Sequence, residues 1–331
     1  MGKKQLCLSI EGGGALGIGP LAFMCRMEQD LGKKLSDLTS AFTGTSTGAI
    51  IAACLAEGMS AHDVFELYRS NLKKIFTKYS WYKRLQPKCP TYDNKNLKKL
   101  LQANLKGKCS DWKKPIYITT TFMNGDSVEK VWDLGDKETD KWFAVLSSTA
   151  APTYFDVLER DGESYMDGGC WANCPADIVI AGQYRQGNKN LKLLNFNTGM
   201  DTPNTEKGNK TLLGWAEYLI GDWIARSSKS PIYEAKAILG DDAVFNASPK
   251  HNKKIKMDKV DDDTVEQIID IWQKYYETVR ADIKAFMNRY GGAGVYERLL
   301  PVRLRLPEQG LLPERARGQA REVYHLYQQK R

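Results

Sequence analysis

The first 200 residues alternate between short apolar runs and amphipathic stretches. Five of the runs are rich in β-branched, aliphatic or aromatic residues and have the length of strands. They are Leu6–Ile10, Ser40–Thr43, Ile116–Phe122, Val128–Trp132 and Leu191–Phe196. Helices are predicted between several of them, the first from about Ala15 to Leu31. Strands that alternate with helices are typical of an α/β fold with a mostly parallel sheet that helices cover on both faces.

Two further helices are predicted with more specific signals. Ala49–Ala56 is apolar on every side, as expected of a helix packed inside a protein, and Gly58 is placed to end it. Ser60–Asp63 has the pattern of a capping box and predicts the start of the next helix. The part from about residue 210 to 290 is predicted to be mainly helical, with a long periodic stretch over Val265–Met287.

The composition changes after Gly291-Gly292 to a sequence rich in Arg, Leu, Pro and Gln without periodicity. We therefore expect one domain over residues 4–290 and a C-terminal tail of unknown role over residues 291–331. No apolar run approaches the roughly 20 residues that cross a bilayer, and the start of the chain has no signal-peptide pattern. We expect a water-soluble, cytoplasmic protein whose membrane contact is peripheral.

The seven cysteines include no CxxC pair, and the chain has three histidines. Neither a structural zinc site nor a disulfide framework is indicated, so we expect free thiols, no metal and no cofactor.

The net charge of +8 is concentrated in one segment, residues 69–108. This segment holds twelve Lys or Arg residues and a single acid, Asp93, with Phe, Tyr and Trp interspersed. We interpret it as a basic cap or lid-like insertion that can dock on an anionic membrane. A solvated basic helix face and, less favoured, a nucleic-acid surface are the alternatives. The candidate membrane-binding residues are Lys73, Lys74, Lys78, Trp81, Lys83 and Arg84.

The sequence Gly44-Thr45-Ser46-Thr47-Gly48 has the G-x-S-x-G pattern of a nucleophile elbow. It follows a predicted strand and precedes a predicted helix, and the small residues Gly44 and Gly48 leave room for a sharp turn. Ser46 is the candidate nucleophile. Only about one strand–helix unit precedes it, which excludes a standard α/β-hydrolase, because there the elbow follows several strands.

A glycine-rich loop, Gly12-Gly13-Gly14, ends the first predicted strand. Its backbone N–H groups can stabilise an oxyanion, since no side chain covers them. Gly12, Gly14 and Gly17 also satisfy the G-x-G-x-x-G pattern of dinucleotide-binding folds. That alternative is disfavoured because the second strand ends at the elbow and not at an acidic residue.

The candidate general base is Asp167, in the turn Asp167-Gly168-Gly169 after the strand-like residues 164–166. Aspartate is a weak base at neutral pH unless burial raises its pKa. A triad with His251 keeps the usual order but is disfavoured, since His251 lies among lysines. His62 falls in the capping box and His325 in the tail.

As an ordered set, the glycine loop, the elbow and the Asp-Gly-Gly turn resemble the patatin-like phospholipase family. Ser147–Phe155, Asp167–Ala176 and Asn195–Gly199 resemble further segments of that family. Relatives usually carry Asp or a small residue at Glu11 and a basic residue at Leu16. The resemblance implies a three-layer α/β/α sandwich and a Ser46–Asp167 dyad that forms an acyl-enzyme, with Gly12, Gly13 and Gly14 as the oxyanion hole and no need for metal or calcium.

The resemblance thus implies a lipid acyl hydrolase of the phospholipase A or lysophospholipase type, acting on phospholipids or lysophospholipids at a membrane surface. Two alternatives stay open. One is a catalytically silent protein of the same fold that binds membrane or nucleic acid. The other is an enzyme that depends on a small-molecule or protein activator, as in nucleotide-activated phospholipases of antiviral defence.

Overall fold

The computed structural model describes residues 5–86, 88–198, 229–250 and 255–290, with Thr211 and Trp215 as isolated positions. The predicted tail over residues 291–331 and the candidate His251 lie outside this part of the chain.

Within the described residues, eight strands form one mixed sheet in the order β5-β6-β3-β2-β1-β7-β8, with β4 paired to the other edge of β3. The strands are β1 (Gln5–Ile10), β2 (Thr39–Gly44), β3 (Ile116–Phe122), β4 (Glu129–Trp132), β5 (Leu158–Arg160), β6 (Glu163–Asp167), β7 (Leu191–Phe196) and β8 (Val244–Ala247). The central strands β3, β2, β1, β7 and β8 are parallel, whereas β4 and β6 run antiparallel to β3 and β5 runs antiparallel to β6.

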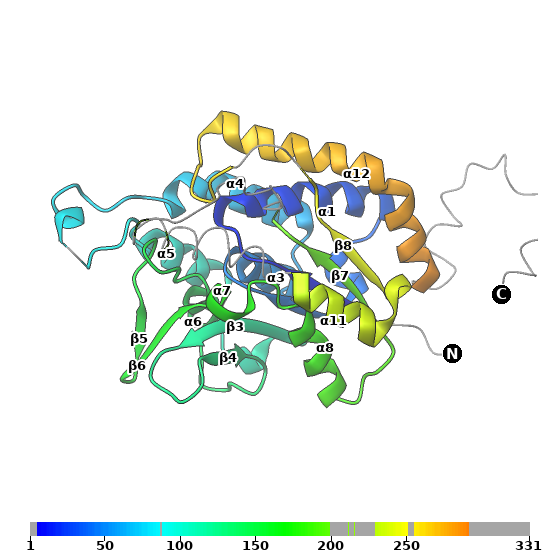
Figure 1. Cartoon of the computed structure of the whole chain (residues 1–331), viewed down its shortest axis with the longest axis horizontal. Helices are drawn as coiled ribbons and strands as arrows, with labels where there is room; N and C mark the ends of the chain where they lie inside the picture. Colours follow the sequence, from blue (N-terminus) through cyan, green and yellow to red (C-terminus); the bar gives the residue numbers. More distant parts are fainter. Residues whose placement is uncertain are drawn as a thin grey trace, which may run out of the picture. The chain divides into compact units, whose positions relative to one another are not determined.

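Helices cover both faces of the sheet (Figure 1). They are α1 (Ile18–Leu31), α2 (Leu35–Leu38), α3 (Thr47–Ala56), α4 (Ala61–Ile75), α5 (Lys95–Asn104), α6 (Lys141–Ser148), α7 (Gly169–Ala172), α8 (Ala176–Arg185), α11 (Lys229–Leu239) and α12 (Asp262–Tyr290). Short 3₁₀ helices are η1 (Gly14–Gly17), η2 (Lys83–Leu85), η3 (Cys109–Asp111) and η5 (Asp241–Ala243). The arrangement is the three-layer α/β/α fold that the sequence predicts.

The strands alternate their side chains between two cores. Cys7, Leu191 and Leu193 pack with Val179 of α8 and Ala235 of α11. On the other face, Phe196 meets Phe23 of α1 edge to face, and Phe23 in turn contacts Trp272 and Tyr276 of α12. Burial on both faces explains why these strands read as continuous apolar runs.

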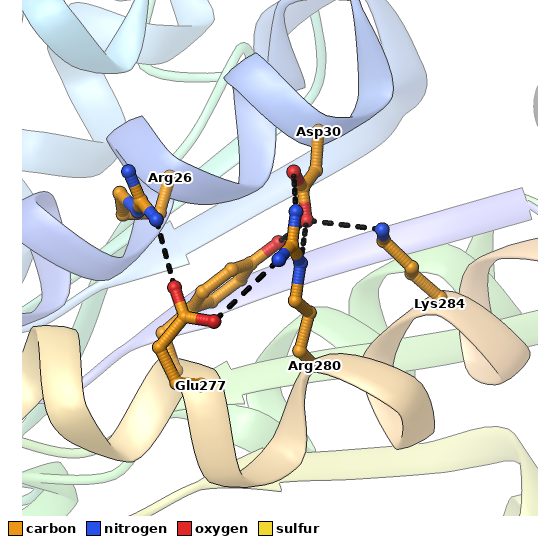
Figure 2. A network of polar contacts seen from close by, with 6 residues as sticks. Arg26, Asp30, Glu277, Arg280 and Lys284 are labelled. Carbon is orange, nitrogen blue, oxygen red and sulfur yellow. Dashed lines mark hydrogen bonds and ion pairs between the residues drawn. The ribbon is translucent and has the colours of Figure 1, made fainter. Parts of the chain in front are cut away.

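A polar network fastens α12 to α1 at the outer rim of this second core (Figure 2). Asp30 accepts two hydrogen bonds of 2.6 Å from Arg280 and one of 2.7 Å from the Tyr276 hydroxyl, and Lys284 lies 3.3 Å from the same carboxylate. The Arg280 guanidinium, followed by Tyr276 and Lys284, holds the pKa of Asp30 well below its usual range.

The local predictions agree with these elements, and one short strand lies within the region predicted to be mainly helical. All five predicted strands are present, Ser60 and Asp63 form the capping box, and every residue of α3 is buried. The region predicted to be mainly helical contains α11 and α12 but also β8, a four-residue strand that extends the sheet beyond β7. β8 is too short to show periodicity, and its pairing with β7 decides its conformation.

Candidate active site

The topology of the sheet brings the elbow and the Asp-Gly-Gly turn together. β4 occupies one edge of β3, and β2 and β6 share the other edge one after the other. Gly44, the last residue of β2, pairs with Ile118, whereas Asp167, the last residue of β6, pairs with Thr120. Because β6 is antiparallel, its carboxyl end meets the carboxyl end of β2. Ser46 and Asp167, 121 positions apart in sequence, therefore line the same pocket.

Ser46 occupies a sharp, strained turn between β2 and α3. Its φ of 55° and ψ of −123° are unusual for a residue with a side chain. The turn closes tightly: a Cβ on Gly44 would lie 2.2 Å from the Gly48 carbonyl oxygen, and one on Gly48 would lie 2.1 Å from that of Ile10. The Ser46 N–H donates to Ser148 Oγ at 2.9 Å, so the end of α6 also holds the turn. This is the geometry of a nucleophile elbow.

Asp167 is buried beside this turn. Its Oδ1 accepts the Gly169 N–H at 2.7 Å, and its Oδ2 has no hydrogen-bond partner among the described residues. Burial raises the pKa of Asp167 to about 6, although Ser46 and the Gly169 N–H act to lower it. The Ser46 hydroxyl is thus near enough to affect the carboxyl, without a hydrogen bond of ordinary geometry between them. A carboxylate with this pKa is ionised at neutral pH and a stronger base than an exposed aspartate.

The glycine loop divides into one residue whose N–H is occupied and two whose N–H groups are available. The Gly12 N–H donates to the Asn173 carbonyl oxygen at 3.2 Å, and Gly12 does not line the pocket. The N–H groups of Gly13 and Gly14 have no acceptor among the described residues, and both residues line the pocket. Of the three glycines, only Gly13 and Gly14 thus combine a place in the pocket wall with an N–H that has no acceptor among the described residues.

Two neighbours fix the conformation of this loop. The Tyr68 hydroxyl of α4 donates to the Gly14 carbonyl oxygen at 2.8 Å and is also hydrogen-bonded to Thr47 Oγ1 at the start of α3. The Met257 carbonyl oxygen accepts the Ala15 N–H at 2.7 Å. Gly14 has a φ of +55°, and a Cβ there would lie 2.4 Å from the Met257 oxygen, so only glycine fits. Tyr68 and Met257 carry no sequence signal that links them to the site, because tertiary packing alone brings them there. Ser148 lies in the segment Ser147–Phe155 that resembles the family, but its hydrogen bond to Ser46 depends on tertiary packing.

Ser46 and Asp167 lie in a pocket with an empty volume of about 790 Å³, part of which is open to solvent. Most of its wall is apolar and comes from α3, the end of α4, α5 and the segment after α6. These wall residues include Ile50, Ile75, Phe76, Leu97, Ala151, Pro152 and Phe155. A hydrocarbon chain fits such a wall, because binding there removes apolar surface of both partners from water.

The basic segment 69–108 has two different parts. Its ends belong to α4 and α5, whose buried residues Leu72 and Leu97 pack into the body of the domain. Its middle leaves the end of α4 and projects away from the sheet as a loop, drawn in cyan in Figure 1. Lys78, Trp81, Lys83 and Arg84 lie on the projecting part and are exposed. Lys74 is exposed on α4, and Lys73 of α4 pairs with Asp262 of α12 at 2.8 Å.

The described residues contain no cluster of three or more His, Cys, Asp or Glu that could hold a metal ion. None of their helices is long and apolar enough to cross a bilayer. His62 is exposed at the start of α4, where it belongs to the capped first turn, and it does not line the pocket.

An α/β/α sandwich with a nucleophile elbow, a buried aspartate and a glycine-rich loop is an arrangement typical of hydrolases. Comparison with known proteins gives the family. A family model described as patatin-like phospholipase matches residues 8–180, slightly more than half of the chain. The chain belongs to the patatin-like phospholipase family, whose members are hydrolases.

Curated relatives are similar to part of this chain. The cGAMP-activated phospholipase of Vibrio cholerae is 32% identical over 214 residues, which cover 55% of this chain and 59% of that protein. Patatin-like protein 2 of Arabidopsis thaliana is 26% identical over 291 residues, 73% of this chain and 71% of that protein. The chain thus spans about three fifths of the length of the Vibrio relative. The crystal structure of VipD from Legionella pneumophila matches with 15% identity and a TM-score of 0.39 over 82% of this chain and 67% of that one.

Proposed function

We propose that this protein is a lipid acyl hydrolase that cleaves carboxylic esters of phospholipids or lysophospholipids through a Ser46–Asp167 dyad. The observation that carries the proposal is the shared pocket: a serine on a strained elbow lies beside a buried aspartate of raised pKa, within an apolar cavity. Family membership and the phospholipase names of the relatives support the substrate class.

The proposed reaction begins with attack of Ser46 Oγ on the ester carbonyl carbon while Asp167 accepts the hydroxyl proton. The N–H groups of Gly13 and Gly14 stabilise the tetrahedral oxyanion, and removal of one such donor commonly costs about 10²–10³-fold in rate. Collapse of the intermediate expels the alcohol portion of the lipid, which takes the proton from Asp167. Water, deprotonated by the same carboxylate, then attacks the acyl-enzyme; the fatty acid is released as Asp167 returns the proton to Ser46 Oγ.

The pocket combines Ser46 and Asp167 with a mostly apolar wall, and this combination fits a lipid ester. The ester lies at Ser46, and the acyl chain extends along the wall formed by Ile50, Ile75 and Phe155. We propose that the protein works in the cytoplasm with peripheral attachment to a membrane, where such lipids are found. No cofactor is part of the proposed mechanism.

The experiment measures fatty-acid release from mixed phospholipid vesicles without calcium. Wild type is compared with Ser46→Ala and Asp167→Asn, and Asp177→Asn serves as the matched control. Asp177 is a partly buried aspartate on α8 with a raised pKa that does not line the pocket. Release by wild type and the Asp177 variant, but by neither dyad variant, supports the proposal. Undiminished release by Ser46→Ala refutes it.

A second candidate is the same hydrolysis under control of an activator. Curated relatives from Vibrio cholerae and Escherichia coli are both named cGAMP-activated phospholipase. The same release assay with and without added cGAMP tests this candidate. A basal rate near zero that rises on addition of cGAMP and still requires Ser46 supports activation, whereas an equal rate in both conditions refutes it. A protein that stays silent in both conditions and binds vesicles is the third, non-catalytic possibility.

A further inference from the structure

The projecting loop Thr77–Thr91 leaves the domain from a base that hydrogen bonds hold in place. At the base, Lys78 and Tyr92 form an isolated antiparallel bridge. The Tyr79 N–H also donates to the Thr91 carbonyl oxygen at 3.1 Å. The base is tied to the wall of the pocket, because the Tyr92 N–H donates to the Tyr154 carbonyl oxygen at 2.8 Å. The Tyr79 hydroxyl also donates to Asp156 at 2.5 Å. The base is therefore fixed while the loop extends outward.

The tip of the loop exposes large apolar side chains to water. Trp81 is 71% exposed, Tyr82 60% and Leu85 74%, and a cluster of exposed apolar groups is typical of interaction sites. They lie together in residues 81–85, on and next to the short helix η2. Trp81 and Tyr82 contact each other edge to face, with their ring centroids 6.2 Å apart, and do not fold back onto the domain core.

Cations surround these apolar groups. Lys78, Lys83, Arg84 and Lys88 are all exposed, and no Asp or Glu occurs between Arg69 and Asp93. Among the described residues, no ion pair neutralises these four side chains; Lys83 lies over the Tyr79 ring at 4.9 Å. The tip thus carries uncompensated positive charge around an aromatic and aliphatic centre.

The loop adjoins the mouth of the pocket. Ile75 and Phe76, where α4 gives way to the loop, line the pocket, and so does Tyr154, to which the base is bonded. The base of the loop is thus continuous with the wall of the pocket that holds Ser46.

We propose that the tip, residues Lys78–Gln86 together with Lys88, docks on an anionic lipid bilayer, with Trp81, Tyr82 and Leu85 at the level of the headgroups and the cations on lipid phosphates. Trp and Tyr favour this interfacial depth, and each cation near an anionic surface strengthens binding about fivefold. Leu85 favours a bilayer over nucleic acid, because an exposed aliphatic side chain finds an apolar medium only in the bilayer. Docking brings the proposed hydrolase to its lipid substrate, so this role of the tip rests on the proposed function. The binding test itself does not require catalysis.

The test uses the full chain with Ser46→Ala, so that vesicles stay intact, and measures co-sedimentation with phosphatidylcholine vesicles with and without phosphatidylserine. One variant carries Lys78→Gln, Lys83→Gln and Arg84→Gln. A matched control carries Lys33→Gln, Lys137→Gln and Lys189→Gln. These three exposed lysines follow α1, β4 and α8, at the end of the sheet opposite the elbow. A third variant carries Trp81→Ala and Leu85→Ala.

The parent is expected to bind vesicles that contain phosphatidylserine more tightly than phosphatidylcholine alone, and added salt weakens this binding. Loss of the three tip cations is expected to weaken it on the order of 100-fold, while the control changes it less than about threefold. Trp81→Ala with Leu85→Ala is expected to weaken binding to both kinds of vesicle about tenfold or more.

Equal losses in the tip and control variants, or no binding by the parent, overturn the proposal. So does a loss of affinity for a single-stranded oligonucleotide in the tip variant while its vesicle binding is unchanged. Hydrolysis of a short, water-soluble ester by the same loop variants with Ser46 restored separates the two proposals. Hydrolysis by wild type while the parent fails to bind vesicles refutes only the docking surface, whereas no hydrolysis by wild type, with or without cGAMP, while docking is intact refutes the hydrolase.

Discussion

Replacement of Asp167 by Asn is expected to abolish ester hydrolysis and yet stabilise the folded protein at neutral pH. Burial raises the pKa of this carboxyl from 3.8 to about 6. The folded state therefore holds a proton more tightly than the unfolded chain does, and ionisation of Asp167 costs stability. A shift of about two pKa units corresponds to about 3 kcal/mol, which the folded protein loses as the pH rises from about 4 to above 6.

Asparagine occupies the same volume without a charge to desolvate. It keeps an oxygen for the Gly169 N–H, which donates to Asp167 Oδ1 in the wild type. Urea unfolding of Asp167→Asn and wild type, measured at several pH values between about 4 and 8, gives the difference in free energy of unfolding. The variant is expected to gain about 3 kcal/mol relative to wild type between the two ends of this range. Because a new amide N–H2 is buried beside Ser46, the absolute gain at pH 8 is expected to be smaller, about 1–3 kcal/mol.

Asp30 provides a control of opposite sign (Figure 2). Arg280 holds the pKa of Asp30 well below its usual range, so the ionised carboxylate stabilises the folded state. This contribution is present above about pH 4 and is lost as the pH falls through the folded-state pKa. Asp30→Asn is therefore expected to lose stability at neutral pH, while Asp167→Asn gains it.

The reasoning is refuted if the stability difference between Asp167→Asn and wild type does not change with pH, or if it decreases between pH 4 and 8. Either result means that the carboxyl is not desolvated as its burial indicates, and that it cannot have the basicity which the proposed mechanism needs.

Three further predictions concern the site. With a water-soluble ester, kcat/KM of the wild type is expected to rise with one ionisation near pH 6 and to level off above it, because Asp167 must be ionised to accept the Ser46 proton. A kcat/KM that does not change across this pH range contradicts the assignment of Asp167 as the base. Tyr68→Phe removes the hydroxyl that donates to the Gly14 carbonyl oxygen, so kcat is expected to fall about tenfold with little change in KM; steady-state kinetics showing an unchanged kcat would falsify the positioning role. Gly48→Ala places a Cβ 2.1 Å from the Ile10 carbonyl oxygen. A thermal melt is therefore expected to show destabilisation by more than about 3 kcal/mol, whereas an unchanged melting temperature would show that the turn can relax.

The sequence predicts the parts of the site that depend on local conformation. A Cβ on Gly44 would meet the backbone of Gly48 and Ala49 within the turn, whereas one on Gly48 would meet the backbone of Ile10 and Glu11 at the end of β1. Both glycines belong to the short G-x-S-x-G pattern, which is visible in the sequence. The strand runs are equally readable, since burial on both faces requires apolar residues at every position. The capping box at Ser60 reflects hydrogen bonds within four residues.

Residues that act on the site from a distance could not be predicted in this way. Tyr68 reaches Gly14 from the middle of a helix whose pattern shows only an amphipathic element. Ser148 bonds the Ser46 N–H across 102 positions. The occupied N–H of Gly12 was likewise invisible, because its acceptor, the Asn173 carbonyl, belongs to the backbone and leaves no trace in the sequence.

The sequence by itself thus determined the α/β fold class, the elbow, the glycine loop and the basic character of residues 69–108, since each depends on neighbours along the chain. Only the tertiary structure decided that β6 runs antiparallel on the same edge of β3 as β2, which places Asp167 beside Ser46. It also decided that Asp167 is buried and that the tip of the basic loop is exposed. Burial and strand pairing depend on residues far away in sequence, and their physical effects, a raised pKa and an apolar surface in water, arise only once the chain has folded.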